Sequence, residues 1–406
     1  MFVRSPRAAR QVGLLGPAFV AAVAYVDPGN VATNVTAGAE YGYTLVWVVV
    51  LANAMAVIVQ YLSAKLGLVT GRSLASHMGD VLPRRTRIAY WLQAEAVAVA
   101  TDVAEVVGGA VALALLFDLP LLPGALVTVA VSVLVLKVGD RWGQSALERL
   151  VMAFLLLIAV GFTAGLFVAP PEATDVVGGL APRFDGTGSV LLASGIIGAT
   201  VMPHVIYLHS GLTSGRLGRR GLLRSTRELI AATRVDVVVA LVVAGTLNLA
   251  LLLVAATSLA GLPGTDTLEG VHALMTSELG AGVALLFAVA LLGSGLASTS
   301  VGCAAGAEVM AGLLNKRVPV LVRRLVTVIP ALVVLVLGIN PAHALIGSQV
   351  VLSVGIPFAL IPLLWLTSRR DLMGEHANRR SLTAAAVVVA GIVIVLNVAL
   401  LVLTFA

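Results

Sequence analysis

Long apolar stretches separated by short polar connections run along this chain of 406 residues. A stretch of about 20 apolar residues is long enough to cross a bilayer as an α-helix. The pattern predicts eleven such spans, at residues 13–37, 44–69, 88–117, 121–138, 147–169, 188–213, 235–258, 280–314, 320–339, 342–366 and 382–404. We therefore expect an all-α integral membrane protein.

The composition supports this assignment. Hydrophobic residues make up 59% of the chain and charged residues 11%, whereas soluble proteins contain roughly 25% charged residues. Cys303 is the single cysteine. It excludes an intramolecular disulfide and leaves too few thiolates for a zinc or iron–sulfur site.

The first residues allow two interpretations. Three arginines are followed by an apolar run that contains small residues, as in a secretory signal; the arginines are Arg4, Arg7 and Arg10. Cleavage near Ala24 would remove the start of the segment that carries Asp27. Because the apolar pattern resumes after residue 30, we interpret this region as the first transmembrane helix and keep the cleaved signal as the alternative.

Basic residues gather in alternate connections. Six groups hold all but two of the 26 lysines and arginines, at the N-terminus and at 70–87, 137–149, 214–234, 315–324 and 367–380. Lys65 lies on the same side of the predicted membrane as these six groups, and only Arg183 lies on the opposite side. Positive charge is retained on the cytoplasmic side of membrane proteins. The pattern predicts a cytoplasmic N-terminus and an external C-terminus, and it relates the net charge of +6 to orientation rather than to nucleic acid.

Two stretches are interrupted by proline together with groups that can bind a cation. Asp27-Pro28-Gly29-Asn30 lies in the first, and Ala199-Thr200-Val201-Met202-Pro203-His204 lies in the sixth. Proline removes a backbone donor and clashes with the preceding turn, which frees carbonyl oxygens as ligands. A carboxylate within the bilayer is costly and by default indicates a functional site. The two breaks predict a transporter that handles a cation.

The breaks occupy equivalent places in two halves of the chain. Spans one to five and six to ten are similar in length, and an odd number of spans in each half makes the halves inverted. Interrupted helices at corresponding positions of inverted repeats indicate a substrate site. We predict one transport domain over 1–406, with a first repeat at 13–169, a second at 188–366 and an additional helix at 382–404.

The residue types at the breaks predict a divalent transition-metal site. Asp27 offers a carboxylate and Asn30 an amide oxygen, while Pro203 cannot donate to the carbonyl of Ala199. Met202 adds a thioether, a softer ligand that Mg²⁺ and Ca²⁺ do not use, so the set fits Mn²⁺ or Fe²⁺. The alternatives are a polar kink with a neutralised carboxylate, and a methionine that only packs in the core.

Further polar groups at membrane depth are candidates for proton transfer. His204 and His209 follow the second break, and histidine titrates near neutral pH. Three carboxylates share one stripe of the third span. At about 100° per residue, Glu95 and Asp102 lie about 20° apart around the helix, and Glu105 lies within about 80° of both. The candidate partners of these carboxylates are Arg323 and Arg324. The alternatives are a proton exit path and a structural ion-pair cluster.

Two amides complete the set of candidates. Gln349 lies in the tenth span and Asn248 in the seventh. Either side chain could approach the metal, or it could form a hydrogen bond between helices, as polar residues in membrane bundles commonly do.

With these motifs in place, the chain closely resembles the Nramp family of metal-ion transporters, whose bacterial members are proton-coupled manganese transporters. The resemblance covers nearly the whole chain and includes residues 195–204, 100–105 and 348–350. It implies a leucine-transporter-type fold, with two inverted five-helix repeats plus an eleventh transmembrane helix. It also implies metal coordination by Asp27, Asn30, the Ala199 carbonyl, the Met202 sulfur and, in some states, Gln349.

The same resemblance assigns the proton pathway to Asp27, His204, Asp102, Glu105 and the Arg323/Arg324 pair. It implies import of Mn²⁺ or Fe²⁺ as substrate with H⁺ as co-substrate, and no permanently bound cofactor. We expect a protein that functions as a monomer in the bacterial inner membrane. The alternatives are a proton-coupled amino-acid symporter of the same fold and a cation channel; a membrane enzyme is not favoured, since no nucleophile and base cluster in the sequence.

Overall fold

The first half of the chain forms a series of helices. The computed structural model describes residues 16–142, 144–215, 225–316 and 318–405, and these ranges contain no β-strand. The elements of the first half are α2 (Pro17–Ala24), α3 (Pro28–Tyr41), η1 (Gly42–Leu45), α4 (Val46–Thr70), α5 (Leu74–Val81), α6 (Arg84–Phe117), α7 (Leu121–Trp142), α8 (Gln144–Val168) and α9 (Ala173–Gly178).

The second half repeats this style of construction. Its elements are α10 (Gly186–Thr200), α11 (Pro203–Ser214), α13 (Thr226–Ser258), α14 (Leu268–Glu278), α15 (Ala281–Leu314), α16 (Val320–Thr327), α17 (Ile329–Val336), α18 (Pro341–Ser368), α19 (Arg370–Met373), η2 (Gly374–His376) and α20 (Arg380–Phe405). Each of the eleven predicted spans coincides with one or two of these helices.

Eight helical stretches in the described ranges are both long and apolar enough to cross a membrane, and one of them joins α3, η1 and α4. The other three predicted spans are not among these eight stretches. The first begins with α2, which ends at the break before Asp27. The fourth lies in α7, where the search within the described residues covers the apolar stretch Leu121–Val135. The ninth is divided between α16 and α17, and Pro330 is the second residue of α17.

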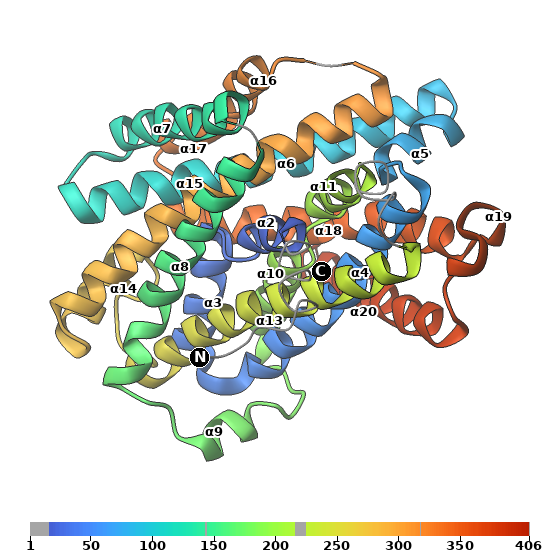
Figure 1. Cartoon of the computed structure of the whole chain (residues 1–406). Helices are drawn as coiled ribbons and strands as arrows, with labels where there is room; N and C mark the ends of the chain where they lie inside the picture. Colours follow the sequence, from blue (N-terminus) through green and yellow to red (C-terminus); the bar gives the residue numbers. More distant parts are fainter. Residues whose placement is uncertain (1–15, 143, 216–224, 317, 406) are drawn as a thin grey trace, which may run out of the picture.

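The two broken helices lie at the centre of the bundle. In Figure 1, α2, α3 and α10 lie in the middle of the molecule, with α11 and α18 beside them, and longer helices surround them. The contacts agree with this view: α3 packs against α13 and α10, and α11 packs against α4 and α15. Helix α18 packs against α3, α10 and α11. The fold therefore surrounds both breaks with protein rather than lipid.

The described part of the first span belongs to the core. The residues of α2 are buried apart from Phe19, and this helix packs against α13, α15 and α11. The three arginines that resemble part of a secretory signal, Arg4, Arg7 and Arg10, lie outside the described residues. What the structure adds is that α2 fills the interior next to the first break.

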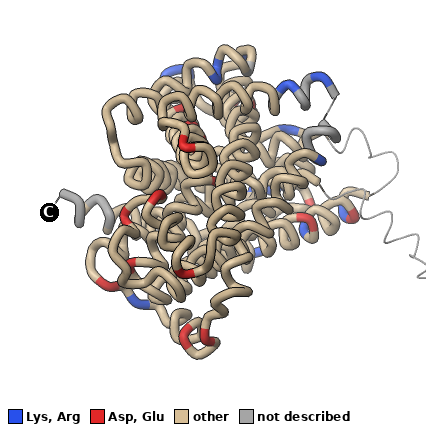
Figure 2. The backbone as a smooth tube through the Cα atoms, turned by 90° about the vertical axis from the view of Figure 1, so that its left-hand side faces the viewer, with Lys and Arg blue, Asp and Glu red and all other residues tan. Residues whose placement is uncertain are grey.

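Charges separate along the molecule. Figure 2 shows most lysines and arginines toward the top and the right-hand side, whereas the lower left carries mainly aspartate and glutamate. Of the predicted basic groups, Arg216, Arg219, Arg220, Arg224 and Arg317 lie outside the described residues. The separation among the described charges agrees with the alternating basic connections of the sequence.

Small residues let α18 approach both breaks. A Cβ added to Gly198 of α10 would lie 2.1 Å from the backbone oxygen of Gln349 and 2.8 Å from the backbone nitrogen of Ser353. A Cβ on Gly29 would lie 1.7 Å from the Gln349 side-chain nitrogen. All three distances are shorter than a normal contact, so α18 comes this close to both breaks only because these positions are glycine.

We predict that Gly198→Ala destabilises the protein by about 1–3 kcal/mol, the usual effect of overpacking a core. The methyl group would meet backbone atoms of α18, which cannot rotate away. Gly347→Ala is the matched control, since Gly347 is on α18 itself and nothing lies within 4 Å of an added Cβ. Thermal unfolding of the purified variants in detergent measures the effect. Equal midpoints for the two variants would contradict this account of the packing.

Candidate metal site

The first break is built around Asp27. Its backbone is extended, with φ −70° and ψ 166°, and it caps the N-terminus of α3, which begins at Pro28. The carboxylate accepts a hydrogen bond from the backbone N–H of Asn30 at 2.7 Å. Aspartate at an N-cap satisfies a helix donor that has no other partner. The local sequence thus turns the chain and fixes the carboxylate at the start of a helix.

The second break mirrors the first. Helix α10 ends at Thr200, and α11 begins at Pro203 with Met202 as its N-cap. Pro203 has no N–H to donate to the Ala199 carbonyl, as the sequence predicted. That carbonyl instead accepts a hydrogen bond from the Asn30 side-chain nitrogen at 2.9 Å. The same nitrogen donates to the Asp27 carboxylate at 2.8 Å, so Asn30 joins the two breaks directly.

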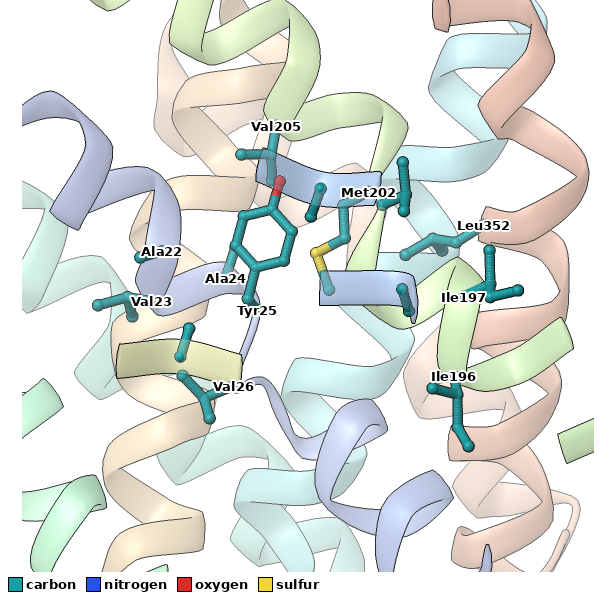
Figure 3. Close-up of a cluster of buried hydrophobic side chains, with 14 of the residues drawn as sticks. Ala22, Val23, Ala24, Tyr25, Val26, Ile196, Ile197, Met202, Val205 and Leu352 are labelled. Atoms are coloured by element: carbon teal, nitrogen blue, oxygen red, sulfur yellow. The ribbon is translucent and has the colours of Figure 1, made fainter. Parts of the chain in front are cut away.

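Gln349 and Met202 complete the group. The Gln349 side-chain nitrogen lies 3.4 Å from the second carboxylate oxygen of Asp27. Met202 is fully buried in the core, and Figure 3 shows its sulfur with Tyr25 and Leu352 in the cluster where the broken segments meet. The structure therefore brings all five predicted metal-site residues, including Asn30 and Ala199, to one junction.

Unpaired oxygens mark this junction. The side-chain oxygens of Asn30 and Gln349 are buried and accept no hydrogen bond within the described part of the chain. A buried acceptor without a donor is unfavourable, and such groups call for an explanation such as an ion. All five residues have 0% exposure. The junction is a closed polar site with acceptor capacity left over.

Other helices satisfy the backbone of the first break. The side-chain nitrogen of Asn248 donates to the Tyr25 carbonyl at 2.8 Å, and the Ser294 hydroxyl donates to the Val26 carbonyl. Asn248 also accepts from Asn34 at 3.1 Å. The structure thus places Asn248 on the backbone of the break rather than among the metal-site oxygens. The sequence left both roles open.

A second network lies beside the break. His209 bonds through its Nδ1 to the Gln60 side-chain oxygen at 2.8 Å, and Gln60 donates to the Tyr25 hydroxyl. Asp236 accepts from the backbone N–H groups of Gly16 and Ala18, each at 3.2 Å, at the start of α2. Sequence analysis missed Gln60, Tyr25 and Asp236. The signal was present, because Gln60 and Asp236 are polar residues inside apolar spans.

His204 lies between the junction and α6. It is buried, and its Nδ1 lies 3.3 Å from the Thr101 hydroxyl. Its Nε2 has no hydrogen-bond partner within the described ranges. Because Met202 caps the helix in which His204 stands, the imidazole is two residues from the metal junction and next to the carboxylate-bearing helix.

The carboxylates of α6 pair with consecutive arginines of α16. The Arg323 guanidinium lies 2.8 Å from Glu95, and Arg324 bonds Asp102 and lies 3.5 Å from Glu105. The Arg324 side chain has 0% exposure. Gly306 of α15 makes room, since a Cβ there would lie 1.3 Å from the Arg323 guanidinium. The sequence identified these groups, and the structure supplies their pairing.

His77, which lies outside the predicted spans, has a local role. His77 of α5 bonds Thr70 through its Nε2 at 3.0 Å. Burial lowers the pKa of His77 below its ordinary value, and the nearby Arg72 lowers it further. His77 is therefore kept neutral and serves to connect α5 to the end of α4.

Two broken helices that meet at a buried polar junction, inside an all-helical membrane bundle, define a transporter of the leucine-transporter-type fold. Solved structures agree. A manganese transporter of Eremococcus coleocola superposes with a TM-score of 0.86 at 29% identity, covering 98% of this chain and 87% of that one. MhsT in complex with L-phenylalanine superposes with a TM-score of 0.61 at 13% identity, over 95% of this chain and 97% of that chain, which shows the fold alone.

Residues 18–403 match the family described as natural resistance-associated macrophage protein-like, and the chain belongs to this Nramp family. It is 56% identical over 391 residues to the divalent metal cation transporter MntH of Mycobacterium tuberculosis, covering 96% of this chain and 91% of that protein. The MntH of Deinococcus radiodurans is 46% identical over 395 residues, covering 97% and 90%. The chain is thus a divalent metal-ion transporter of the membrane and not an enzyme.

We predict that Arg324→Gln destabilises the protein by about 3–5 kcal/mol, the usual effect of removing one partner of a buried ion pair. The change leaves Asp102 and Glu105 buried without their cation. Arg323→Gln is the comparison, because its partner Glu95 is 19% exposed and can be hydrated. Thermal unfolding in detergent is the measurement. Adding Asp102→Asn to Arg324→Gln should recover part of the loss, and no recovery would contradict the pairing.

Proposed function

We propose that this protein imports Mn²⁺, and also Fe²⁺, together with protons by alternating access. The proposal rests chiefly on one observation, the bridge that Asn30 makes between the Asp27 carboxylate and the Ala199 carbonyl. The related manganese transporter and MntH proteins support the choice of cargo. The metal is the substrate, H⁺ is the co-substrate, and the site needs no resident cofactor.

The Asn30 amide supports a cation site by its position. Its nitrogen donates to two oxygens at 2.8 and 2.9 Å, so partial positive charge already lies between them. A metal ion bound to the Asp27 and Ala199 oxygens takes the place of these donors. Rotation of the amide then turns the Asn30 oxygen, which has no donor in the described structure, toward the metal.

Met202 supplies the selectivity. Carboxylate, amide and carbonyl oxygens bind Ca²⁺ as well as Mn²⁺, whereas a thioether favours softer transition metals. The described residues contain no group of three or more histidine, cysteine, aspartate or glutamate side chains that could hold a metal. A site with a single carboxylate and a thioether fits a cargo that must also leave.

The proton route runs from the junction toward the ion pairs. Asp27 and His204 lie at or beside the metal junction, and Thr101 connects His204 to α6. From there Asp102 and Glu105, both held by Arg324, continue the polar path, and Glu95 with Arg323 extends it to a partly exposed position. Chains of ionisable residues at membrane depth are characteristic of proton relays.

Alternating access follows from the closed junction. Since each metal-site residue has 0% exposure, ions enter and leave only when the broken helices rearrange. We assign the first repeat to 13–169, the second to 188–366 and the additional helix to 382–404. Each repeat then begins with a broken helix. The basic connections support a cytoplasmic N-terminus and an external C-terminus. The protein acts in the bacterial inner membrane as a monomer.

We predict that Asp27→Ala reduces Mn²⁺ uptake into sealed liposomes by more than about 10–100-fold. Removing a residue that only hydrogen-bonds to a metal ligand already costs that much in metal affinity or activity, and Asp27 is proposed as a ligand itself. The native protein should acidify the lumen as Mn²⁺ enters, and the variant should do neither. Glu172→Ala is a suitable control, because Glu172 is an exposed carboxylate in a connection far along the chain from the breaks. Normal uptake by Asp27→Ala would refute the site; Mn²⁺ uptake by native protein without acidification would refute proton coupling.

We predict that Met202→Ala weakens exclusion of Ca²⁺ more than it weakens Mn²⁺ transport, because only the soft ligand is lost. Uptake of both ions into liposomes measures the ratio. Met275→Ala is the matched control, since Met275 is a methionine buried to a similar degree, on α14. Unchanged Ca²⁺ exclusion in Met202→Ala would show that the thioether does not act as a filter.

A further inference from the structure

A large groove lies on the side of the bundle, away from the metal junction. It is bounded by α4, α13, η2 and the start of α20, and its volume is about 1080 Å³. In Figure 1, α4, α13 and α20 lie in the same part of the molecule, and α4 packs against both of the others. Neither the metal site nor the ion pairs use any residue of this groove.

One end of the groove is basic. Its lining includes Lys65 of α4, Arg227 and Arg234 of α13, and Arg379 just before α20. Glu375 also lines this end, and it lies 3.5 Å from the imidazole of His376. The balance at this end is four cations against one carboxylate, so the groove suits an anion.

The arginines are available for a ligand. Arg227, Arg234 and Arg379 are exposed, and none forms an ion pair with an acidic residue among those the structure describes. Lys65 differs, because it is 4% exposed, donates to Asn378 and lies 5.8 Å from the centre of the Tyr61 ring. Its amino group lies at the back of the groove, where Asn378 holds it.

The rest of the groove is apolar. Val57 and Ile58 line it from α4, and Val235, Val238 and Val239 line it from α13. The three valines of α13 are 38–56% exposed, as expected for side chains that face lipid tails. The groove therefore has a charged end and an oily wall rather than a uniform surface.

The order along the helices matches an amphipathic ligand. Arg227, Arg234 and Val238 fall on one stripe of α13. They are seven and four residues apart, and each of these steps brings the next side chain to within about 40° of the previous one around the helix axis. Arg227 precedes the apolar segment and Val238 lies within it. On α4, which runs in the opposite sense, Lys65 lies near the end and Val57 lies deeper. Both walls thus change from basic to apolar in the same direction.

We propose that this groove binds an anionic phospholipid of the leaflet on the basic side of the protein, with its phosphate on Arg227, Arg234 and Arg379 and an acyl chain along the α13 valines. Basic pockets between transmembrane helices bind anionic head groups in this way. A free phosphate ion would use the same arginines but would leave the apolar wall without a partner. The geometry therefore favours a lipid over a soluble anion.

The test compares lipid classes on the full-length native protein. Phosphatidylglycerol, phosphatidylcholine, inorganic phosphate or glycerol phosphate is added to the purified protein in detergent. Thermal unfolding then gives the midpoint temperature, and native mass spectrometry detects bound lipid. Phosphatidylglycerol should bind and raise the midpoint, whereas the other three should not. Equal effects of the two lipids, or an equal effect of either soluble anion, would overturn the proposal.

The residue assignment is tested with a matched pair of triple variants. Arg227→Gln/Arg234→Gln/Arg379→Gln removes the proposed head-group contacts. Arg84→Gln/Arg85→Gln/Arg370→Gln removes the same charge from exposed arginines outside the groove. Because each basic residue near an anionic membrane is worth about fivefold in affinity, the first should weaken phosphatidylglycerol binding by about 100-fold and the second should leave it nearly unchanged. Equal binding by the two variants would overturn the proposal. If the first fails to fold, the lipid comparison on the native protein still decides it.

Discussion

A helix that breaks inside a membrane leaves backbone groups that lipid cannot satisfy, and the centre of this protein is organised by that constraint. The structure meets it with side chains from other helices. Asn248 and Ser294 donate to the carbonyls of the first break, and Asn30 donates to the Ala199 carbonyl of the second. Neighbouring helices therefore satisfy backbone groups that each break exposes. The same requirement that holds the bundle together also gathers oxygens at one point, where they can serve a metal ion.

Around this junction the remaining polar groups form a second buried system. The α6 carboxylates lie next to the arginines of α16, and the Arg324 side chain has no exposure to solvent. Charges at this depth are tolerated because they are paired, and glycines such as Gly306 leave the space that the guanidinium groups occupy. His204 and Thr101 lie between the two systems. A change in the protonation of one carboxylate would thus be felt at the ion pair and, through α11, near the junction.

Much of this arrangement could be predicted from the sequence. The breaks at Asp27 and Met202 were visible because proline and polar residues interrupt apolar runs, and the residue types indicated the cargo. The pairing of Arg323 and Arg324 could not be predicted, since consecutive residues point about 100° apart on a helix and only packing decides which carboxylate each meets. Asn248 and Asp236 were visible as polar residues inside apolar spans, but their partners were not. These partners include backbone groups of the first break and of the start of α2, which carry no signal in the sequence.

The central claim is that one metal ion is held by both breaks, with the Met202 thioether among its ligands. X-ray absorption spectroscopy of Mn²⁺ or Cd²⁺ bound to the purified protein tests this most directly, because sulfur and oxygen scatter differently. The account predicts a shell of oxygen atoms with one sulfur in the native protein, and a shell without sulfur in Met202→Ala. A native shell of oxygen alone, unchanged by the substitution, would contradict it.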